Sequence, residues 1–264
     1  YKFYSLNTAS LSHDDIYGIH HIYGVPLEPP SGIYSSGENT DVNSNTPDKC
    51  NTSYDAIATI RGELFIFKEE FMWRPDITDE FNEVRQLWNE LPEKRHIDAV
   101  FEISNGKILF FIGDQIFIFE NTNLVDKLRL YHIGMNWDVK QIDAIFRWPY
   151  NNKVYIFTGN NYYRIDEKLL RVETNYPKQI ASAFRDVYSI DTAFNFNNQL
   201  YFFKDEYFYE FDDNVMRMKR MQPQLSAVKF MKCIAPKYFT ARTHFNSENQ
   251  DYIIYEEGDV NDTN

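Results

Sequence analysis

The sequence predicts an all-β fold, a four-bladed β-propeller over residues 50–233, from three observations. Four segments resemble one another, and each opens with an aspartate at the head of an apolar strand; the aspartates are Asp55, Asp98, Asp143 and Asp191. Their spacings are 43, 45 and 48 residues, and strand repeats of about this length are typical of propeller blades. Two cysteines, Cys50 and Cys233, bracket the repeats.

Each repeat divides into three apolar strands joined by two turns. The first strand ends at Arg61-Gly62, Asn105-Gly106, Asn151-Asn152 or Asn197-Asn198. Asn-Gly is a strong hairpin signal, and asparagine tolerates the positive φ of such turns. The second strands are Leu64–Phe67, Ile108–Ile112, Val154–Phe157 and Leu200–Phe203. The third is aromatic, as in "QIFIFE", and the polar stretch after it predicts an outer strand and a short helix. The blades span about 54–96, 97–141, 142–189 and 190–233.

The aromatic residues, Phe 22 and Tyr 19 in number, supply enough apolar surface for a large core. One dense row comprises Phe202, Phe203, Tyr207, Phe208 and Tyr209. Such a row could form a ligand platform, but we expect core between the blades.

The segments outside the repeats differ in composition. "LSHDDIYGIHHIYG" predicts a short helix, because Ser12 can cap it and Gly24 can end it. Residues 25–49 are rich in Pro, Gly, Ser and Asn and predict a flexible linker. Residues 234–264 predict a disordered acidic tail. Its acidic run could bind a partner, although a solvated end is the commoner case.

The cysteines flank the repeats where a bond could join the first and last parts of a ring. We favour a disulfide over two buried free thiols, and a disulfide indicates an oxidising, extracellular setting. Two glycosylation sequons, at Asn51 and Asn261, agree with a secreted protein.

Charge and hydropathy exclude some classes of protein. The 27 basic and 39 acidic residues give a net charge of −12, which argues against binding a nucleic-acid backbone. No apolar run approaches the roughly 20 residues of a membrane-spanning helix. The chain starts at Tyr1 without a signal-type segment, so we expect a fragment or a processed product.

The repeats resemble the hemopexin-type domain shared by matrix metalloproteinases, hemopexin and vitronectin. The resemblance is carried by the Asp-Ala or Asp-Thr pairs, the strands "LFIF", "KILFF", "KVYIF" and "LYFF", and the bracketing cysteines. The segment "LSHDDIYGIHHIYG" resembles the last helix of the matrix metalloproteinase catalytic domain. This resemblance implies a remnant of that domain over 1–24, a hinge over 25–49 and a propeller over 50–233.

The resemblance also implies a zinc protease upstream, but the zinc-binding His-Glu-x-x-His helix is absent from the sequence. The histidines are His13, His20, His21, His96, His132 and His244. We interpret them as solvated or packing residues rather than zinc ligands, and we expect no peptide hydrolysis by this chain. Catalytic residues are therefore predicted to be none, with zinc only in the missing catalytic domain.

In the resembled family, main-chain carbonyls at the aspartate of each repeat coordinate calcium in the channel. By position these are Asp55, Asp98, Asp143 and Asp191. A less certain second ring would be Ile57, Val100, Ile145 and Ala193. Oxygen ligands in a ring suit a hard cation. The alternative is that the carboxylates bond to backbone amides and fix the blade geometry, which would not exclude a carbonyl-bound ion.

The function implied by the resemblance is recognition. The propeller would bind extracellular-matrix proteins such as collagen, or proteinase inhibitors, or a second copy of itself, and would position the upstream protease. The alternative is a stand-alone hemopexin-type carrier or adhesion module binding haem, polyamine or glycan.

Overall fold

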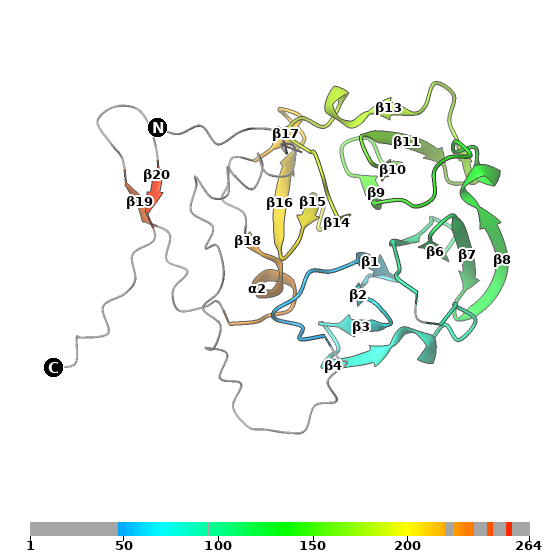
Figure 1. Ribbon diagram of the computed structural model, residues 1–264, viewed down its shortest axis with the longest axis horizontal. Coiled ribbons are helices and arrows are strands. Elements are labelled where there is room, and N and C mark those ends of the chain that lie inside the picture. Colours follow the sequence, from blue (N-terminus) through cyan, green and yellow to red (C-terminus); the bar gives the residue numbers. More distant parts are fainter. Residues whose placement is uncertain (1–46, 94, 220–223, 235–241, 245–251, 255–264) are drawn as a thin grey trace, which may run out of the picture. The chain divides into compact units, whose positions relative to one another are not determined.

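The computed structural model describes residues 47–93, 95–219, 224–234, 242–244 and 252–254. The chain divides into two compact units, one formed by residues 45–233 and the other by 1–44 with 234–264. In the first unit, four antiparallel sheets surround a common axis, with the first strand of each sheet innermost (Figure 1). The predicted four-bladed propeller is confirmed.

The blades repeat one strand order. Blade 1 contains β1 (Ala56–Ile60), β2 (Glu63–Lys68), β3 (Phe71–Arg74) and β4 (Thr78–Glu83). Blade 2 contains β5 (Ala99–Glu102), β6 (Lys107–Ile112), β7 (Gln115–Glu120) and β8 (Asn123–Arg129). Blade 3 contains β9 (Ala144–Trp148), β10 (Lys153–Thr158), β11 (Asn161–Asp166), β12 (Arg171–Val172) and β13 (Lys178–Gln179). Blade 4 contains β14 (Thr192–Phe196), β15 (Gln199–Lys204), β16 (Tyr207–Asp212), β17 (Arg217–Met218) and β18 (Gln224–Leu225).

Short helices follow the outer strands, as the sequence predicted. They are η1 (Val84–Gln86), η2 (Leu130–Ile133), η3 (Ile180–Ser182) and α2 (Ser226–Phe230). In the second unit, β19 (Arg242–His244) pairs with β20 (Tyr252–Ile254). The predicted helix, most of the predicted linker and most of the predicted tail lie outside the described residues.

The turns between first and second strands have the backbone that their residues predicted. Gly62 and Gly106 have φ values of +80° and +83°, a region that favours glycine. Asn152 and Asn198 take φ values of +56° and +63° in the corresponding turns of blades 3 and 4. Hairpin turns with positive φ match the twist of the flanking strands, so these residues set the register of each first hairpin.

The core consists of four apolar clusters, one at each interface between neighbouring blades. Each cluster joins alternate residues of one blade's strands to those of the next blade. The aromatic row behaves mainly as core: Phe202, Phe203, Tyr207 and Phe208 are buried and Tyr209 is half-buried. A single blade therefore cannot bury its own faces, and each depends on both neighbours.

Polar contacts also join neighbouring blades. The Glu102 carboxylate accepts a hydrogen bond from the Arg61 N–H at 2.5 Å, which links blades 1 and 2. Glu167 of blade 3 accepts hydrogen bonds from the backbone and side chain of Ser104 in blade 2, both at 2.9 Å. Trp148 Nε1 donates to the Asp213 carboxylate at 2.6 Å and links blades 3 and 4.

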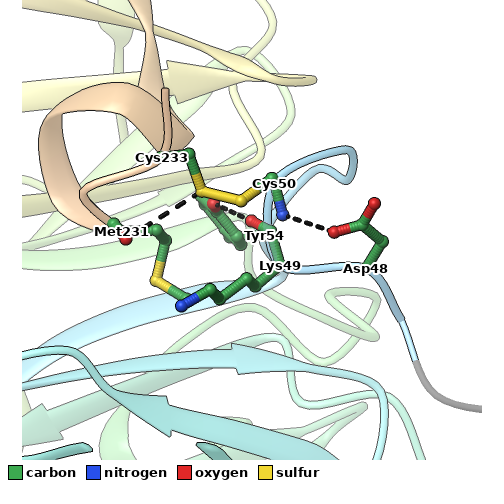
Figure 2. The surroundings of a disulfide bond; sticks show 6 residues. All are labelled: Asp48, Lys49, Cys50, Tyr54, Met231 and Cys233. Atoms are coloured by element: carbon green, nitrogen blue, oxygen red, sulfur yellow. Dashed lines mark hydrogen bonds between the residues drawn. A yellow bond between two sulfur atoms is a disulfide. The ribbon is translucent and has the colours of Figure 1, made fainter. Parts of the chain in front are cut away.

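Blade 4 is joined to blade 1 by a disulfide between Cys50 and Cys233, across 183 residues of sequence (Figure 2). The predicted bond is confirmed, and both cysteines that the structure describes take part in it. Beside it, the Tyr54 hydroxyl donates to the Lys49 carbonyl at 2.8 Å, and the Cys50 N–H donates to Asp48 at 2.9 Å. Both hydrogen bonds lie within the N-terminal segment of blade 1 and fix its backbone on the Cys50 side, while the disulfide itself joins this segment to the end of blade 4.

Phe184 lies at the centre of the cluster between blades 3 and 4, with ring centroids 4.6 Å from Trp148 and 5.0 Å from Phe157. Phe184→Ala should destabilise the fold by about 3–5 kcal/mol, since it removes a fully buried ring from several aromatic contacts. Tyr188→Ala, at a side chain that is 57% exposed, is the control and should change stability by less than about 0.5 kcal/mol. Urea unfolding of both variants measures the difference, and equal midpoints would contradict the assigned role of Phe184.

Candidate metal centre

The four repeat aspartates occupy equivalent backbone positions at the start of the innermost strands. Each aspartate N–H donates to the carbonyl of the phenylalanine that lies opposite the next residue. The pairs are Asp55–Phe67 and Asp98–Phe111 at 2.9 Å, and Asp143–Phe157 and Asp191–Phe203 at 2.8 Å. Because each aspartate directly precedes the innermost strand of its blade, the four predicted positions lie at the same end of the channel.

The aspartate carboxylates cap the turns between second and third strands. The acceptor–donor pairs are Asp55 with the Glu69 N–H, Asp98 with Gly113, Asp143 with Gly159 and Asp191 with Asp205, at 2.5–2.6 Å. The alternative interpretation of the side chains, as acceptors for backbone amides, is thus what the structure shows. It says nothing against a role for the main-chain carbonyls.

The carboxylates differ in their counter-charges. Lys68 Nζ lies 2.9 Å from Asp55 in blade 1, and Lys204 Nζ lies 2.7 Å from Asp191 in blade 4. Blades 2 and 3 carry Ile112 and Thr158 at the corresponding positions. Two of the four carboxylates therefore have no lysine partner at that position.

The pKa values follow this asymmetry. The pKa of Asp98 is raised to about 6, mainly by burial and also by the charges of Asp143 and Asp55, against the lowering effects of the Gly113 N–H and His96. Burial also raises the pKa of Asp143, with a contribution from Asp191. Burial acts in the same direction on Asp55, but hydrogen bonds from His96, Glu69 and Lys68 outweigh it and lower the pKa of that carboxyl.

His96 lies between the aspartates of blades 1 and 2. Its Nδ1 is 3.2 Å from Asp55 and its Nε2 is 3.7 Å from Asp98, and the side chain is 60% exposed. The hydrogen bond with Asp55 raises the pKa of the imidazole, which favours the imidazolium form. From the sequence, His96 was interpreted as a solvated or packing residue, and its contact with two repeat aspartates was not predicted. Its position two residues before Asp98 could have indicated that it lies near the aspartates.

The remaining predicted site residues fall in different places. His132 accepts the Arg129 N–H at 3.1 Å and packs beside Tyr131, as a packing histidine would. His13, His20, His21 and the side chain of His244 lie outside the described residues, as does Asn261. Within the described ranges, no group of three or more His, Cys, Asp or Glu side chains is arranged to hold a metal. Asn51 is exposed.

The predicted second ring lies further along the same channel. Ile57, Val100 and Ile145 line a cavity of about 160 Å³ to which all four innermost strands contribute. Ala193 is not among its lining residues, whereas the neighbouring Phe194 and Asn195 are. Blade 4 therefore contributes only the residues three and four positions after its aspartate to this part of the channel wall.

Three segments of the chain match the model of the Hemopexin family: residues 97–130, 142–187 and 190–233. The fold agrees, since LS24, a seed albumin from Lathyrus sativus, aligns with a TM-score of 0.55 at 18% identity, covering 67% of this chain and 94% of that one. A plant lectin with two metal binding sites from Cicer arietinum aligns at 0.55 and 18%, covering 68% and 95%. The structure is thus a hemopexin-type propeller, and its blade 1 has the same strand order as the three matched blades.

The chain is, more particularly, related to the matrix metalloproteinases. It is 38% identical over 157 residues to matrix metalloproteinase-2 of Drosophila melanogaster, covering 57% of this chain and 21% of that protein. It is 35% identical over 199 residues to stromelysin-3 of Xenopus laevis, covering 70% and 41%. The chain thus spans less than half the length of these relatives. No helix of the described part is long and apolar enough to cross a membrane.

Because the pKa is raised for Asp98 and lowered for Asp55, an Asp→Asn substitution should have opposite effects on stability at these two positions. The measurements are made with a chelator present, so that no bound cation contributes. The pKa of Asp98, about 6, lies above its value of about 3.9 in an unfolded chain, so its stabilising contribution is present at low pH and is lost as pH rises through 6. Asp98→Asn keeps an acceptor for Gly113 and should raise stability at pH 8 by about 1 kcal/mol, after allowance for solvent screening. The gain should shrink as pH falls from about 6 and should be absent near pH 4.

Asp55→Asn is the matched comparison, because the pKa of Asp55 is lowered and its charge stabilises the fold above the unfolded pKa. This variant should lose about 1–3 kcal/mol at pH 8, since Lys68 and His96 lose an ionised acceptor. Urea midpoints at pH 8 and pH 4 give both values. Equal losses in the two variants at pH 8 would show that the carboxylates are equivalent.

Proposed function

We propose that this chain is the non-catalytic recognition region of a secreted zinc endopeptidase of the matrix metalloproteinase type. The observation that carries the proposal is the relationship to matrix metalloproteinases over the propeller repeats. The disulfide between Cys50 and Cys233 supports an extracellular location, since such bonds persist in oxidising environments. An N-glycan at the exposed Asn51 would fit the same location.

The role of the propeller would be to bind matrix proteins such as collagen, or proteinase inhibitors, and to position an upstream protease on them. Rigid blades suit this role, because binding residues in the turns are then held by a core that does not rearrange. A second copy of the chain is a further candidate partner. The alternative is a stand-alone carrier of haem, polyamine or glycan, and the relationship to matrix metalloproteinases favours the recognition role over it.

The binding test uses the whole chain with its disulfide intact. We expect saturable binding to immobilised fibrillar collagen or to a matrix metalloproteinase inhibitor protein, with no cleavage of a fluorogenic peptide by the chain alone. The same chain reduced and alkylated at Cys50 and Cys233 is the control, and it should lose binding along with the closed ring. Saturable binding of haem, with neither collagen nor inhibitor bound, would favour the carrier instead.

We also propose that calcium binds in the channel, held by the main-chain carbonyls of Asp55, Asp98, Asp143 and Asp191. The charges at this end support it: four aspartates outnumber the two lysines and the His96 imidazolium, and burial together with neighbouring carboxylates raises the pKa of Asp98 and Asp143. Carbonyl oxygens are ligands that calcium accepts. The ion would stabilise the ring and take no part in chemistry.

Carbonyl ligation predicts that calcium binding survives loss of a carboxylate charge. Asp143→Asn keeps its carbonyl and an acceptor for Gly159, so calcium should still bind, with affinity reduced by no more than about tenfold through the lost charge. Calcium should raise the melting temperature of the wild-type chain and of this variant, and a chelator should reverse both shifts. Isothermal titration would contradict the proposal if neither protein bound calcium at millimolar concentration, or if the variant bound none.

A further inference from the structure

A polar cavity lies at the end of the channel opposite the repeat aspartates. It has a volume of about 160 Å³ and is lined by residues of β1, β5, β9 and β14. Its polar side chains stand four residues after the aspartate of each blade; they are Thr59, Glu102, Arg147 and Asn195. An alignment of the four repeats would have shown that each innermost strand carries a polar residue at this equivalent position.

Two oxygen atoms at this cavity have no partner. The Thr59 hydroxyl and the Asn195 amide oxygen are shielded from solvent and make no hydrogen bond within the described part of the chain. Leaving a buried polar group unpaired costs about 1–3 kcal/mol, so two of them in one cavity call for an explanation. Both belong to residues that line the cavity, and a bound group with N–H donors would satisfy both oxygens once their side chains turned toward it.

The charge of the cavity favours a cationic donor. Glu102 accepts one backbone N–H, from Arg61, and forms no ion pair with any residue that the structure describes. Arg147 brings no net positive charge, because Glu167 accepts hydrogen bonds from both of its terminal nitrogens at 2.8 and 2.7 Å. The Arg147 guanidinium holds the pKa of Glu167 at about 2, so this pair stays ionised and neutral overall. Glu102 therefore leaves the cavity with a net negative charge.

The turns around this end carry exposed apolar side chains. Strand direction alternates within a blade, so the turns after first strands and after third strands lie at the same end as the cavity. These turns hold Ile77, Tyr150, Leu169 and Val215, which are 64%, 61%, 73% and 52% exposed. They belong to blades 1, 3 and 4. Tyr150 follows an innermost strand, whereas the other three follow third strands and lie further from the axis. A negatively charged cavity with these apolar turns as its outer rim resembles the anchor pocket of a protein interface.

We propose that this end of the propeller docks a protein loop that inserts a lysine side chain into the cavity. An ammonium group has three donors, matching Thr59, Asn195 and Glu102, and the alkyl stem would pack on Ile57, Val100 and Ile145. Apolar residues beside the lysine would cover the rim. The inference rests on the proposed recognition role and names the chemistry that the partner presents there.

The first test uses n-butylammonium as a mimic of the lysine side chain, with amide resonances of the intact chain followed by NMR in chelator. Saturable shifts are expected at the cavity, and 1-butanol should give none. Thr59→Val and Glu102→Gln should each weaken binding at least tenfold. Thr122→Val and Glu120→Gln, exposed positions at the same end but outside the cavity, are the matched controls and should bind as wild type. Thr59→Val removes an unpaired hydroxyl, so it should unfold no earlier than wild type.

The second test separates a protein loop from a free amine. An end-blocked Gly-Leu-Lys-Leu-Gly peptide should bind at least tenfold more tightly than butylammonium, and its norleucine counterpart should not bind. Leu169→Ser with Tyr150→Ser should weaken the peptide and leave butylammonium unchanged. Equal binding of 1-butanol, wild-type affinity in Thr59→Val and Glu102→Gln, or a peptide no tighter than the amine would each overturn the proposal. Collagen binding that persists in those cases would leave the recognition role intact.

Discussion

Ring closure is the constraint on which the rest of this structure depends. Every blade has two apolar faces, and the four clusters that bury them lie between blades rather than within them. A missing or displaced blade would expose two faces at once, so the sheets are stable only as a set. The interface between blades 4 and 1 joins segments that are far apart in sequence, and it is here that the disulfide lies. In the chain-entropy model, a bond across so long a loop stabilises by about 5 kcal/mol.

The repeat aspartates serve this closure locally. Each carboxylate ties the start of an innermost strand to the turn between the second and third strands, which fixes three strands of a blade in register. The same placement gathers four negative charges at one mouth of the channel, with lysines beside only two of them. The geometry of the blades thus concentrates carboxylates at this mouth, where His96 and the two lysines only partly offset them, and the proposed calcium site rests on this excess of carboxylates.

Much of the fold could be predicted from the sequence because the signals are local and repeated. Asn105-Gly106 and the equivalent turns, the spacing of the aspartates and the placement of Cys50 and Cys233 were sufficient for four blades and their closure. The bridging position of His96 could not be predicted, since it depends on how the start of blade 2 meets blade 1. The unpaired state of Thr59 and Asn195 likewise depends on the approach of innermost strands from different blades, which no local pattern encodes.

The position of the bond between Cys50 and Cys233 has a consequence for proteolysis. Because the two sulfurs enclose all four blades, a peptide bond cut in any turn between them would leave both pieces covalently attached. Such a nicked ring would keep its mass until its thiols were reduced, and the sheets on either side of the break would remain in place beside their neighbours. Exposed turns in a protease-rich setting could therefore be cleaved without release of a blade.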